Sequence, residues 1–354
     1  MGEFRLYPAN AVWEITFVCN MRCLHCGTSA GEKREDELTT GEALRLADDL
    51  AELGCEFLTL SGGEPLLRKD WRELAGRLIK RKVRLGIVTN GWCVTEEIAQ
   101  DFGEIGFNMV GVSFDGTEPT HDHIRQTPGS YKKAYRALEI VKEAGLKNCA
   151  LTQVSKLNLE ELDNIYRDLL KIGTPLWRIQ MTTHTGRMCD SSESALTPED
   201  LPELARKILE IRDKNKIRID VGENIGYYGD LGDNLWFGHA YLGCYAGCRV
   251  IGVESNGNIK GCLSMPEDCV EGNIRERSLK EIWEDMSLFS YNRQFSPDKA
   301  LGFCKDCPHL KMCRCGCATT AMGATGSRFD NPYCLYRIEV EQKKEKSIAS
   351  GRQS

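Results

Sequence analysis

Cysteine is the residue type with the greatest capacity for chemistry in this sequence, and its spacing is uneven. The 354 residues include 17 cysteines, of which three lie close together near the amino terminus and ten fall between Cys244 and Cys334. Thiols grouped in this way are typical of metal or iron–sulfur ligand sets in a reducing compartment, whereas disulfides belong to exported proteins. Four cysteines are isolated from these groups: Cys55, Cys93, Cys149 and Cys189.

The amino-terminal group is the triplet Cys19-x3-Cys23-x2-Cys26, directly after the first predicted strand. Three thiolates on one loop can hold three irons of a [4Fe–4S] cube and leave the fourth iron without a protein ligand. An open iron could bind and activate a small molecule, as a catalytic zinc with an open position does. The triplet alone is also compatible with a zinc site or with incidental cysteines.

Polar, glycine-containing motifs follow the next three predicted strands. Glycine at such positions allows the backbone to approach a ligand closely. Each motif alone is also typical of an ordinary turn, and only their order downstream of the triplet favours a binding site. The motifs are Ser61-Gly62-Gly63-Glu64-Pro65, Thr89-Asn90-Gly91 and Ser113-Phe114-Asp115-Gly116.

The elements that position these motifs alternate between short apolar runs and longer amphipathic stretches. Strands alternating with helices predict parallel βαβ units, which fit either an open doubly wound sheet or a partial β/α barrel. In both architectures ligands bind at the carboxyl ends of the strands. The predicted strands are 12–17, 57–60, 84–88, 109–113, 149–154 and 177–181, and the predicted helices are 40–53, 70–80, 96–102, 131–144 and 159–172.

Taken in order, these motifs resemble those of the radical S-adenosylmethionine (SAM) enzymes. The segment from Cys19 to Cys26, with His25 before the last cysteine, resembles their CxxxCxxC signature. The resemblance spans most of 12–187 and implies a partial (β/α)6 TIM-like barrel rather than the open sheet. It also implies that SAM binds the open iron of a [4Fe–4S] cluster and is cleaved reductively to a 5′-deoxyadenosyl radical.

The same resemblance implies which residues contact SAM. The two glycines and the glutamate match the motif that meets the amino group, and the asparagine matches the ribose-side contact. The serine would reach the carboxylate or the ribose, and the arginine would pair with the carboxylate. The six expected contacts are Gly62, Gly63, Glu64, Asn90, Ser113 and Arg125, and Thr152 and Gln180 at later strand ends are further candidates.

The second cysteine group resembles the SPASM extension of radical SAM enzymes that modify peptides and proteins. This resemblance covers 244–337 and implies two auxiliary [4Fe–4S] clusters with four thiolates each; from spacing alone, structural zinc is an alternative. Cys269 and Cys315 lie outside the pattern and are expected to bind no metal. The implied ligands are Cys244, Cys248, Cys262 and Cys317 for the first cluster, and Cys304, Cys307, Cys313 and Cys334 for the second.

The pattern divides the chain into a barrel domain, a linker, a SPASM domain and a tail. The linker is expected to contain a helix over 201–212 and irregular structure over 221–237. The SPASM domain should open with a β-hairpin around an Asn-Gly turn and include a helix over 279–286, and the charged tail should fray. The four segments are 1–190, 191–243, 244–337 and 338–354.

Composition narrows the partners and the compartment. A formal net charge of −6 does not favour binding to the negatively charged phosphate backbone of a nucleic acid. No apolar run approaches the ~20 residues that span a bilayer, and the first residues lack the pattern of a signal peptide. We therefore expect a cytoplasmic protein with no nucleic-acid or membrane partner.

The SPASM resemblance favours a ribosomally synthesised precursor peptide as substrate, with a C–C or thioether cross-link as the product. The same machinery acting on a sugar, an aminocyclitol or a tetrapyrrole is the first alternative, and a non-catalytic iron–sulfur or zinc protein is the second. A flavodoxin- or ferredoxin-like protein would supply electrons. Since about ten residues precede the first strand, a separate protein is expected to recognise the peptide.

The general base is not assigned. Leu263 follows Cys262, where sulfatase-maturing relatives carry an aspartate base, and this departure argues against formylglycine formation. Four other polar residues occupy plausible places, but a structural role is expected for each: His184, Tyr227, Tyr228 and Asp230.

Overall fold

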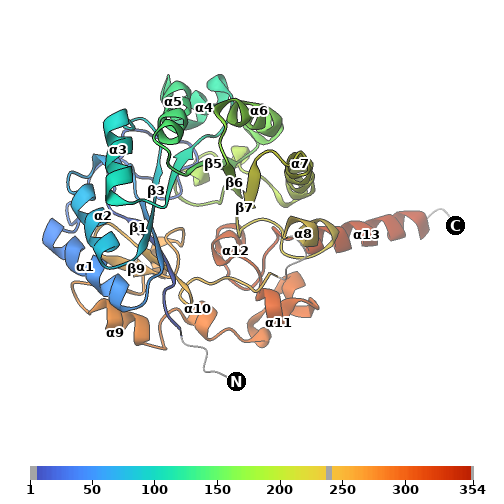
Figure 1. Cartoon of the computed structure of the whole chain (residues 1–354). Helices are drawn as coiled ribbons and strands as arrows, with labels where there is room; N and C mark the ends of the chain where they lie inside the picture. Colours follow the sequence, from blue (N-terminus) through green and yellow to red (C-terminus); the bar gives the residue numbers. More distant parts are fainter. Residues whose placement is uncertain (1–5, 237–240, 352–354) are drawn as a thin grey trace.

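Seven parallel strands form a curved sheet between residues 10 and 221 (Figure 1). The computed structural model of the chain describes residues 6–236 and 241–351. Each strand pairs with the next one in sequence, which is the arrangement that repeated βαβ units produce. The strands are β1 (Asn10–Glu14), β2 (Phe57–Ser61), β3 (Arg84–Thr89), β4 (Met109–Ser113), β5 (Asn148–Val154), β6 (Leu176–Met181) and β7 (Arg218–Val221).

Helices cover the outer face of this sheet (Figure 1). The first begins after Thr39, whose hydroxyl accepts a hydrogen bond from the Glu42 N–H at 3.3 Å, and the Glu42 carboxylate accepts the Thr39 N–H in return. Its Leu46 and Leu50 are fully buried in one cluster with Trp13 of β1. The helices are α1 (Thr40–Glu52), α2 (Trp71–Lys80), α3 (Glu96–Ile105), α4 (Glu118–Arg125), α5 (Ser130–Glu143), α6 (Leu162–Ile172) and α7 (Leu201–Asp213).

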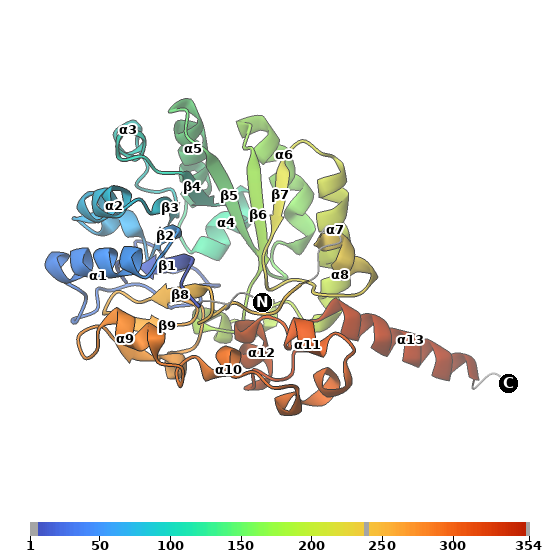
Figure 2. The same cartoon turned by 60° about the horizontal axis from the view of Figure 1, so that its bottom comes forward.

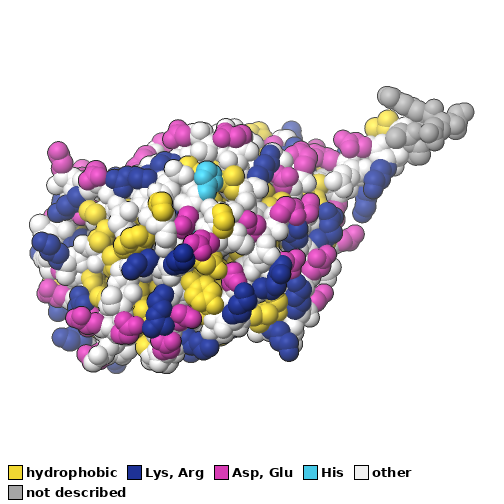
Figure 3. Space-filling view, turned by 90° about the horizontal axis from the view of Figure 1, so that it is seen from above, with side chains coloured by type: hydrophobic (Ala, Val, Ile, Leu, Met, Phe, Trp, Pro, Cys, Tyr) yellow, Lys and Arg dark blue, Asp and Glu magenta, His cyan; other side chains and the backbone are white. Residues whose placement is uncertain are grey.

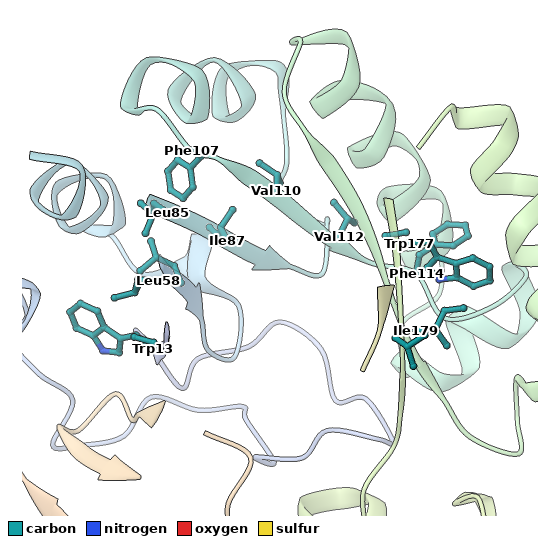
Figure 4. Packing of buried hydrophobic residues seen from close by; sticks show 14 of the residues in the cluster. Trp13, Leu58, Leu85, Ile87, Phe107, Val110, Val112, Phe114, Trp177 and Ile179 are labelled. Atoms are coloured by element: carbon teal, nitrogen blue, oxygen red, sulfur yellow. The ribbon is translucent and has the colours of Figure 1, made fainter. Parts of the chain in front are cut away.

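The hydrophobic core lies between these helices and the outer face of the strands (Figure 4). Successive residues of a strand point to opposite faces, and Ile87 on β3 and Val110 and Val112 on β4 are buried on the outer face. Ser113, the next residue of β4, is only half-buried. The outer face therefore holds the helices, and the inner face is left to line a site.

The C-terminal region extends the same sheet instead of standing apart from it. Strand β8 (Val250–Val253) pairs in parallel with β1, and β9 (Asn258–Lys260) and β10 (Gly272–Asn273) continue the sheet in antiparallel pairs. The predicted hairpin around the Asn-Gly turn is thus present. Figure 2 shows the helices of this region, from α9 to α12, gathered on one side of the barrel. The helices of the C-terminal region are α9 (Leu279–Glu284), α10 (Ser290–Arg293), α11 (Leu310–Cys313) and α12 (Ala318–Thr325), and they are followed by α13 (Leu335–Gly351).

Two expectations about the second half of the chain are wrong. The segment predicted as irregular over 221–237 contains the helix α8 (Asp230–Leu235), and its first residue closes β7. The tail predicted to fray forms α13, because its charges pair along a helix, as Arg337 and Glu341 do at 3.0 Å. The division at residues 190, 243 and 337 stays a prediction, since the sheet runs on across the first two positions.

Acidic and basic side chains alternate over the face shown in Figure 3, with hydrophobic side chains between them. In the same view α13 projects beyond the body of the molecule. Across residues 6–236 and 241–351, none of the helices combines the length and the apolar character needed to cross a bilayer.

Candidate functional site

The three thiols of the triplet lie on the loop after β1, close enough to act on one another electrostatically. Burial, together with smaller effects of the neighbouring Cys23 and Cys26, raises the pKa of the Cys19 thiol to about 11. Burial also raises the pKa of Cys23. Thiolates are the metal-binding form, so metal binding here must displace protons, which couples occupancy of this loop to pH.

The Gly62–Glu64 motif packs directly against the chain segment that leads into the triplet. Gly63 donates its N–H to Thr16 O at 2.8 Å, and Glu64 donates its N–H to Val18 O at 2.7 Å. A Cβ on Gly63 would lie 2.2 Å from Val18 O, a distance that real side chains do not adopt. Glycine is therefore required for this loop to meet the triplet.

Glu64 joins the ends of β2 and β3. Its fully buried carboxylate accepts hydrogen bonds from Thr89 Oγ1 at 2.7 Å and from the Asn90 N–H at 2.8 Å. Burial raises the pKa of Glu64 to about 7, and these hydrogen bonds oppose the shift. Asn90 in turn donates from Nδ2 to Asn20 Oδ1 at 2.7 Å, so the asparagine predicted to face the ribose contacts the triplet loop.

A buried ionic network connects the triplet to the end of β4. Asp115 accepts hydrogen bonds from His25 Nε2 at 3.1 Å and from Arg125. Arg125 Nη1 also lies 3.7 Å from Cys23 Sγ. Burial opposes ionisation of Asp115, but Arg125 and His25 outweigh it and hold the pKa of this carboxyl well below its usual range.

The motif pattern predicts no role for Asp115, although this residue lies within the motif that follows the fourth predicted strand. The sequence does carry a signal for Asp115. It is an acidic residue two positions after a predicted strand end, upstream of Arg125, which the motif pattern selects as a binding residue. Arg125 was predicted to pair with the SAM carboxylate, and in this structure Asp115 and Cys23 are its contacts. Its role toward SAM stays a prediction.

The loop after β6 closes the other side of the triplet. Arg187 donates from Nε to Cys23 O at 2.8 Å and from Nη1 to Ala30 O at 3.0 Å, and a Cβ on Gly186 would lie 2.3 Å from Cys26 O. Sequence analysis singled out neither residue. Four loops, after β2, β3, β4 and β6, therefore converge on the triplet loop that follows β1.

The remaining strand-end candidates differ in their surroundings. Ser113 and Gln180 are half-buried. Gln180 accepts a hydrogen bond from Arg178 Nε at 3.5 Å. Thr152 is fully buried, donates to Phe114 O at 2.5 Å and accepts from Trp177 Nε1 at 2.8 Å, so its hydroxyl already serves the packing of the barrel.

The four thiols predicted for the first auxiliary cluster lie together. Burial, together with smaller effects of Cys244 and Cys317, raises the pKa of Cys262 to about 12. Cys244 likewise raises the pKa of Cys248 and that of Cys317, after burial in each case. The set therefore joins the segments before β8 and after β9 to the residue before α12.

The four thiols predicted for the second auxiliary cluster also lie together. Burial, together with smaller effects of Cys304 and Cys307, raises the pKa of Cys334 to about 12. Burial also raises the pKa of Cys313, and Cys334, Cys304 and Cys307 contribute to that shift. All four line one cavity, together with Tyr227 and other aromatic side chains.

The chain turns sharply between the two sets. Arg314, Cys315 and Gly316 are three consecutive residues with positive φ, at 49°, 63° and 71°. This left-handed turn separates Cys313 in the second set from Cys317 in the first. It gives a physical account of the crossing that the resemblance implied and that spacing could not show.

The two cysteines outside the pattern have different neighbours. Cys315 contacts Cys304, lowers the pKa of that thiol by a hydrogen bond, and lies 3.4 Å from Phe329 O. Cys269 lies 3.9 Å from Met322 Sδ, and no thiol of either set is among the neighbours that shift its pKa. Cys315 is therefore the extra thiol that borders a predicted ligand set.

Of the four polar residues without an assigned role, only His184 lies on a loop that meets the triplet, the loop after β6. Tyr227 and Tyr228 line the cavity of the second set, and the Tyr228 hydroxyl donates to Tyr241 O at 2.7 Å. Asp230 donates its N–H to Glu339 of α13 at 3.0 Å. The ring of His184 lies 6.3 Å from that of Tyr333.

The three thiol sets suit iron–sulfur clusters both in their donor atoms and in the distances between the thiols. Among the described residues, no three His, Cys, Asp or Glu side chains lie close enough to hold a single metal ion. In a cluster each thiolate binds a different iron, so its ligands stand farther apart than those of one ion. Thiols without carboxylates, in one group of three and two groups of four, match this requirement.

Comparison with known families gives two matches. Residues 13–169 match the radical SAM superfamily, and residues 244–308 match SPASM, an iron–sulfur cluster-binding domain. The first match contains the triplet with the Gly62–Glu64, Asn90, Ser113 and Arg125 positions. The second contains five of the eight cysteines predicted for the auxiliary clusters.

Individual proteins resemble the chain over nearly all of its length. It is 32% identical over 345 residues to an AdoMet-dependent heme synthase from Methanosarcina barkeri, covering 93% of this chain and 97% of that protein. It is 27% identical over 328 residues to the mycofactocin maturase MftC from Mycolicibacterium smegmatis, covering 92% of this chain and 81% of that protein.

A solved structure shares the fold. The crystal structure of Streptococcus suis SuiB bound to the precursor peptide SuiA superposes with a TM-score of 0.73, covering 93% of this chain and 76% of that chain. At 16% identity this is a likeness of architecture.

Proposed function

The chain belongs to the radical SAM superfamily and carries a SPASM domain, and from this premise we propose that it cleaves SAM reductively to modify a ribosomally synthesised precursor peptide. The proposed product is a C–C or thioether cross-link. The observation that carries the proposal is the convergence of three thiols, Glu64, Asn90 and Arg125 on one loop at the carboxyl ends of the strands.

In this proposal the residues of the triplet site have separate tasks. Cys19, Cys23 and Cys26 hold the cluster, which with bound SAM supplies a 5′-deoxyadenosyl radical that removes a hydrogen atom from carbon. Glu64 and Asn90 fix the ends of β2 and β3 against the loop, and Ser113 lines the inner face. The loops around the triplet exclude water from the reacting groups.

The two four-thiol sets would each hold one auxiliary [4Fe–4S] cluster. With four protein ligands, neither cluster offers an open iron to the substrate, so both are suited to carrying electrons. A flavodoxin- or ferredoxin-like donor would supply the first electron, and a cytoplasmic setting would keep the thiols reduced. We propose residues 1–190 as the barrel domain and 244–337 as the SPASM domain.

The peptide substrate is supported by two likenesses. MftC is named as a maturase, and SuiB was solved with a precursor peptide bound. Under this proposal a separate protein presents the peptide to the barrel.

A tetrapyrrole is the second candidate substrate. The observation that favours it is the heme synthase from Methanosarcina barkeri, which is 32% identical and matched over 97% of its length. In this alternative the SAM site and the auxiliary sites keep the same tasks, and only the molecule on the inner face of the barrel differs.

One experiment tests the shared chemistry. The protein is reconstituted with iron and sulfide under nitrogen, reduced with dithionite and mixed with SAM, and 5′-deoxyadenosine is measured by mass spectrometry. We expect product from the parent protein and none from the Cys19→Ala/Cys23→Ala/Cys26→Ala variant, which should still hold its auxiliary clusters. SAM cleavage that persists in this variant contradicts the assignment.

A second experiment separates the two substrates. The reduced enzyme and SAM are incubated with a short precursor peptide encoded beside this gene, or with iron-coproporphyrin. A peptide product two mass units lighter is the expected result, because a new cross-link removes two hydrogens. Conversion of the tetrapyrrole with no change in the peptide overturns the peptide proposal.

A further inference from the structure

Tyr227 adopts a backbone conformation that tyrosine rarely takes. It lies between β7 and α8, is 1% exposed and has a φ of +99°. Two glycines leave room for it: a Cβ on Gly316 would lie 2.5 Å from Tyr227 Cε2, and a Cβ on Gly232 would lie 3.2 Å from its carbonyl carbon. A strained conformation over-determined by its neighbours is typical of a position with a functional task.

The side chain of Tyr227 lies between the two four-thiol sets. Its hydroxyl accepts the N–H of Cys317, in the first set, at 3.0 Å. It also accepts Asn331 Nδ2 at 3.3 Å, three residues before Cys334 of the second set. Its ring lines the cavity of the second set and packs on Tyr241, with ring centroids 4.6 Å apart.

The hydroxyl hydrogen of Tyr227 is left without an acceptor. Two donors reach its oxygen, and within residues 6–236 and 241–351 no group accepts a hydrogen bond from it. A buried donor without a partner is costly, so an acceptor is expected when the site is complete. Cysteines of both sets lie near it, Cys317 of the first set and Cys313 and Cys334 of the second, and thiolate and sulfide sulfurs accept hydrogen bonds.

We propose that Tyr227 is a positioning residue that donates its hydroxyl hydrogen to a sulfur of an auxiliary cluster and thereby raises the reduction potential of that cluster. Reduction adds negative charge to a cluster, and a hydrogen bond to sulfur stabilises the added charge. The proposal rests on the auxiliary clusters of the proposed function. In this proposal Tyr227, which lies between the two four-thiol sets, tunes a cluster in addition to packing the core.

The test compares Tyr227→Phe with Tyr228→Phe in the reconstituted full chain. Tyr228 is the matched control, because it is the adjacent buried tyrosine and its hydroxyl already donates to a carbonyl. Iron content is measured first, and the midpoint potential of each cluster is then determined by redox titration monitored by electron paramagnetic resonance. We expect a full iron content and a lower potential for at least one auxiliary cluster in Tyr227→Phe, and unchanged potentials in Tyr228→Phe.

A second variant keeps the test decisive if Tyr227→Phe loses iron. 3-Fluorotyrosine in place of Tyr227 keeps the hydroxyl and the shape but is a stronger donor, so the same potential should rise. Unchanged auxiliary potentials in every Tyr227 variant that retains iron overturn the proposal. A parent protein without auxiliary cluster signals instead overturns the proposed function, which keeps the two failures distinct.

Discussion

At the scale of single residues, buried carboxylates and their hydrogen-bond partners fix the geometry of the site around the thiols. Asp115 orients Arg125 toward Cys23, and Glu64 fixes the ends of two strands. Both carboxylates are fully buried, yet their pKa values shift in opposite directions. The difference follows from their partners, since Asp115 faces a guanidinium and Glu64 faces neutral donors.

Replacing Asp115 by alanine should destabilise the fold by about 3–5 kcal/mol, because it leaves the Arg125 charge buried and unpaired. Urea unfolding under nitrogen measures this. The control is Glu32→Ala, which removes the exposed partner of Arg22 and should cost less than about 1 kcal/mol. An equal decrease in the free energy of unfolding in the two variants would show that the buried network stabilises the fold no more than an exposed ion pair does.

The neighbouring cysteines Cys317 and Cys315 should differ in iron binding. Cys317→Ala removes a predicted ligand and should lose about four irons, one cube. Cys315→Ala removes a thiol that hydrogen-bonds Cys304 and should keep its iron. The iron and sulfide contents of the two variants are measured after identical reconstitution. A similar loss of iron in both variants contradicts the choice of Cys317 as the ligand.

At the scale of elements, the hairpin of β8 and β9 is the joint between the two cysteine regions. Gly252 of β8 lies so close to the loop after β9 that a Cβ on it would be 2.2 Å from Leu263 N. Leu263 follows Cys262, a predicted ligand of the first auxiliary cluster. The geometry of this ligand therefore depends on a strand that also completes the barrel sheet.

Gly252→Ala should push the Cys262 loop outward and reduce the iron content by about four atoms. The matched control is Gly76→Ala in α2, where a Cβ meets nothing within 4 Å and should stabilise the helix by about 0.5–1 kcal/mol. Iron content measured beside the unfolding midpoint separates cluster loss from general instability. A Gly252→Ala protein with its full complement of iron would contradict this role.

Glu14 ties β1 to the same hairpin and makes the joint sensitive to pH. Its buried carboxylate accepts the Ser255 N–H at 3.1 Å and Ser255 Oγ at 2.9 Å. Burial raises the pKa of Glu14 from 4.5 to about 7, against the effect of Arg34. The folded protein therefore binds this proton more tightly than the unfolded chain does.

The stability that Glu14 contributes is full below pH 4.5 and is lost as the pH rises through about 7. Glu14→Gln carries no charge and should remove this dependence, with a gain over the parent of up to about 3 kcal/mol at pH 8. Urea unfolding of both proteins at pH 5 and pH 8 tests it. The same pH dependence in both proteins would exclude Glu14 as the source.

At the scale of the whole molecule, a fully loaded chain should contain about twelve irons, enough for three cubes. The triplet and the two four-thiol sets would supply eleven thiolates, one fewer than three closed cubes need, and in the proposed function SAM takes the last position. Iron and acid-labile sulfide analysis under nitrogen measures the total. A content near four would remove the auxiliary clusters from the proposal.

Much of this molecule follows from its sequence. The strands of the barrel were predicted to within a residue or two, except β1, because each is a short apolar run bounded by turns. The run over 12–17 continues past the end of β1 because Thr16 and Val18 bond the Gly62–Glu64 loop instead of a strand. β7 escaped prediction because its four residues include Arg218 and Asp220.

The grouping of the thiols depends on long-range geometry. Cys317 is closer in sequence to Cys313 than to any other predicted ligand, yet it lies with Cys244 and Cys262. The left-handed turn at Arg314–Gly316 produces this result, and non-glycine residues with positive φ cannot be foreseen from a propensity. Arg187 was missed for a similar reason, since Cys23 and Ala30 lie 164 and 157 residues away; of the partners of Asp115, His25 lies 90 residues away.

The parallel pairing of β1 with β8 has a consequence for biosynthesis. β1 ends at Glu14 and leaves the ribosome long before the strand that covers its open edge, which ends at Val253. At about 5–20 residues per second, that edge waits roughly 12–48 s for its partner. An uncovered parallel edge invites association between nascent chains, so slower translation before residue 250 or early termination there should send this protein into inclusion bodies.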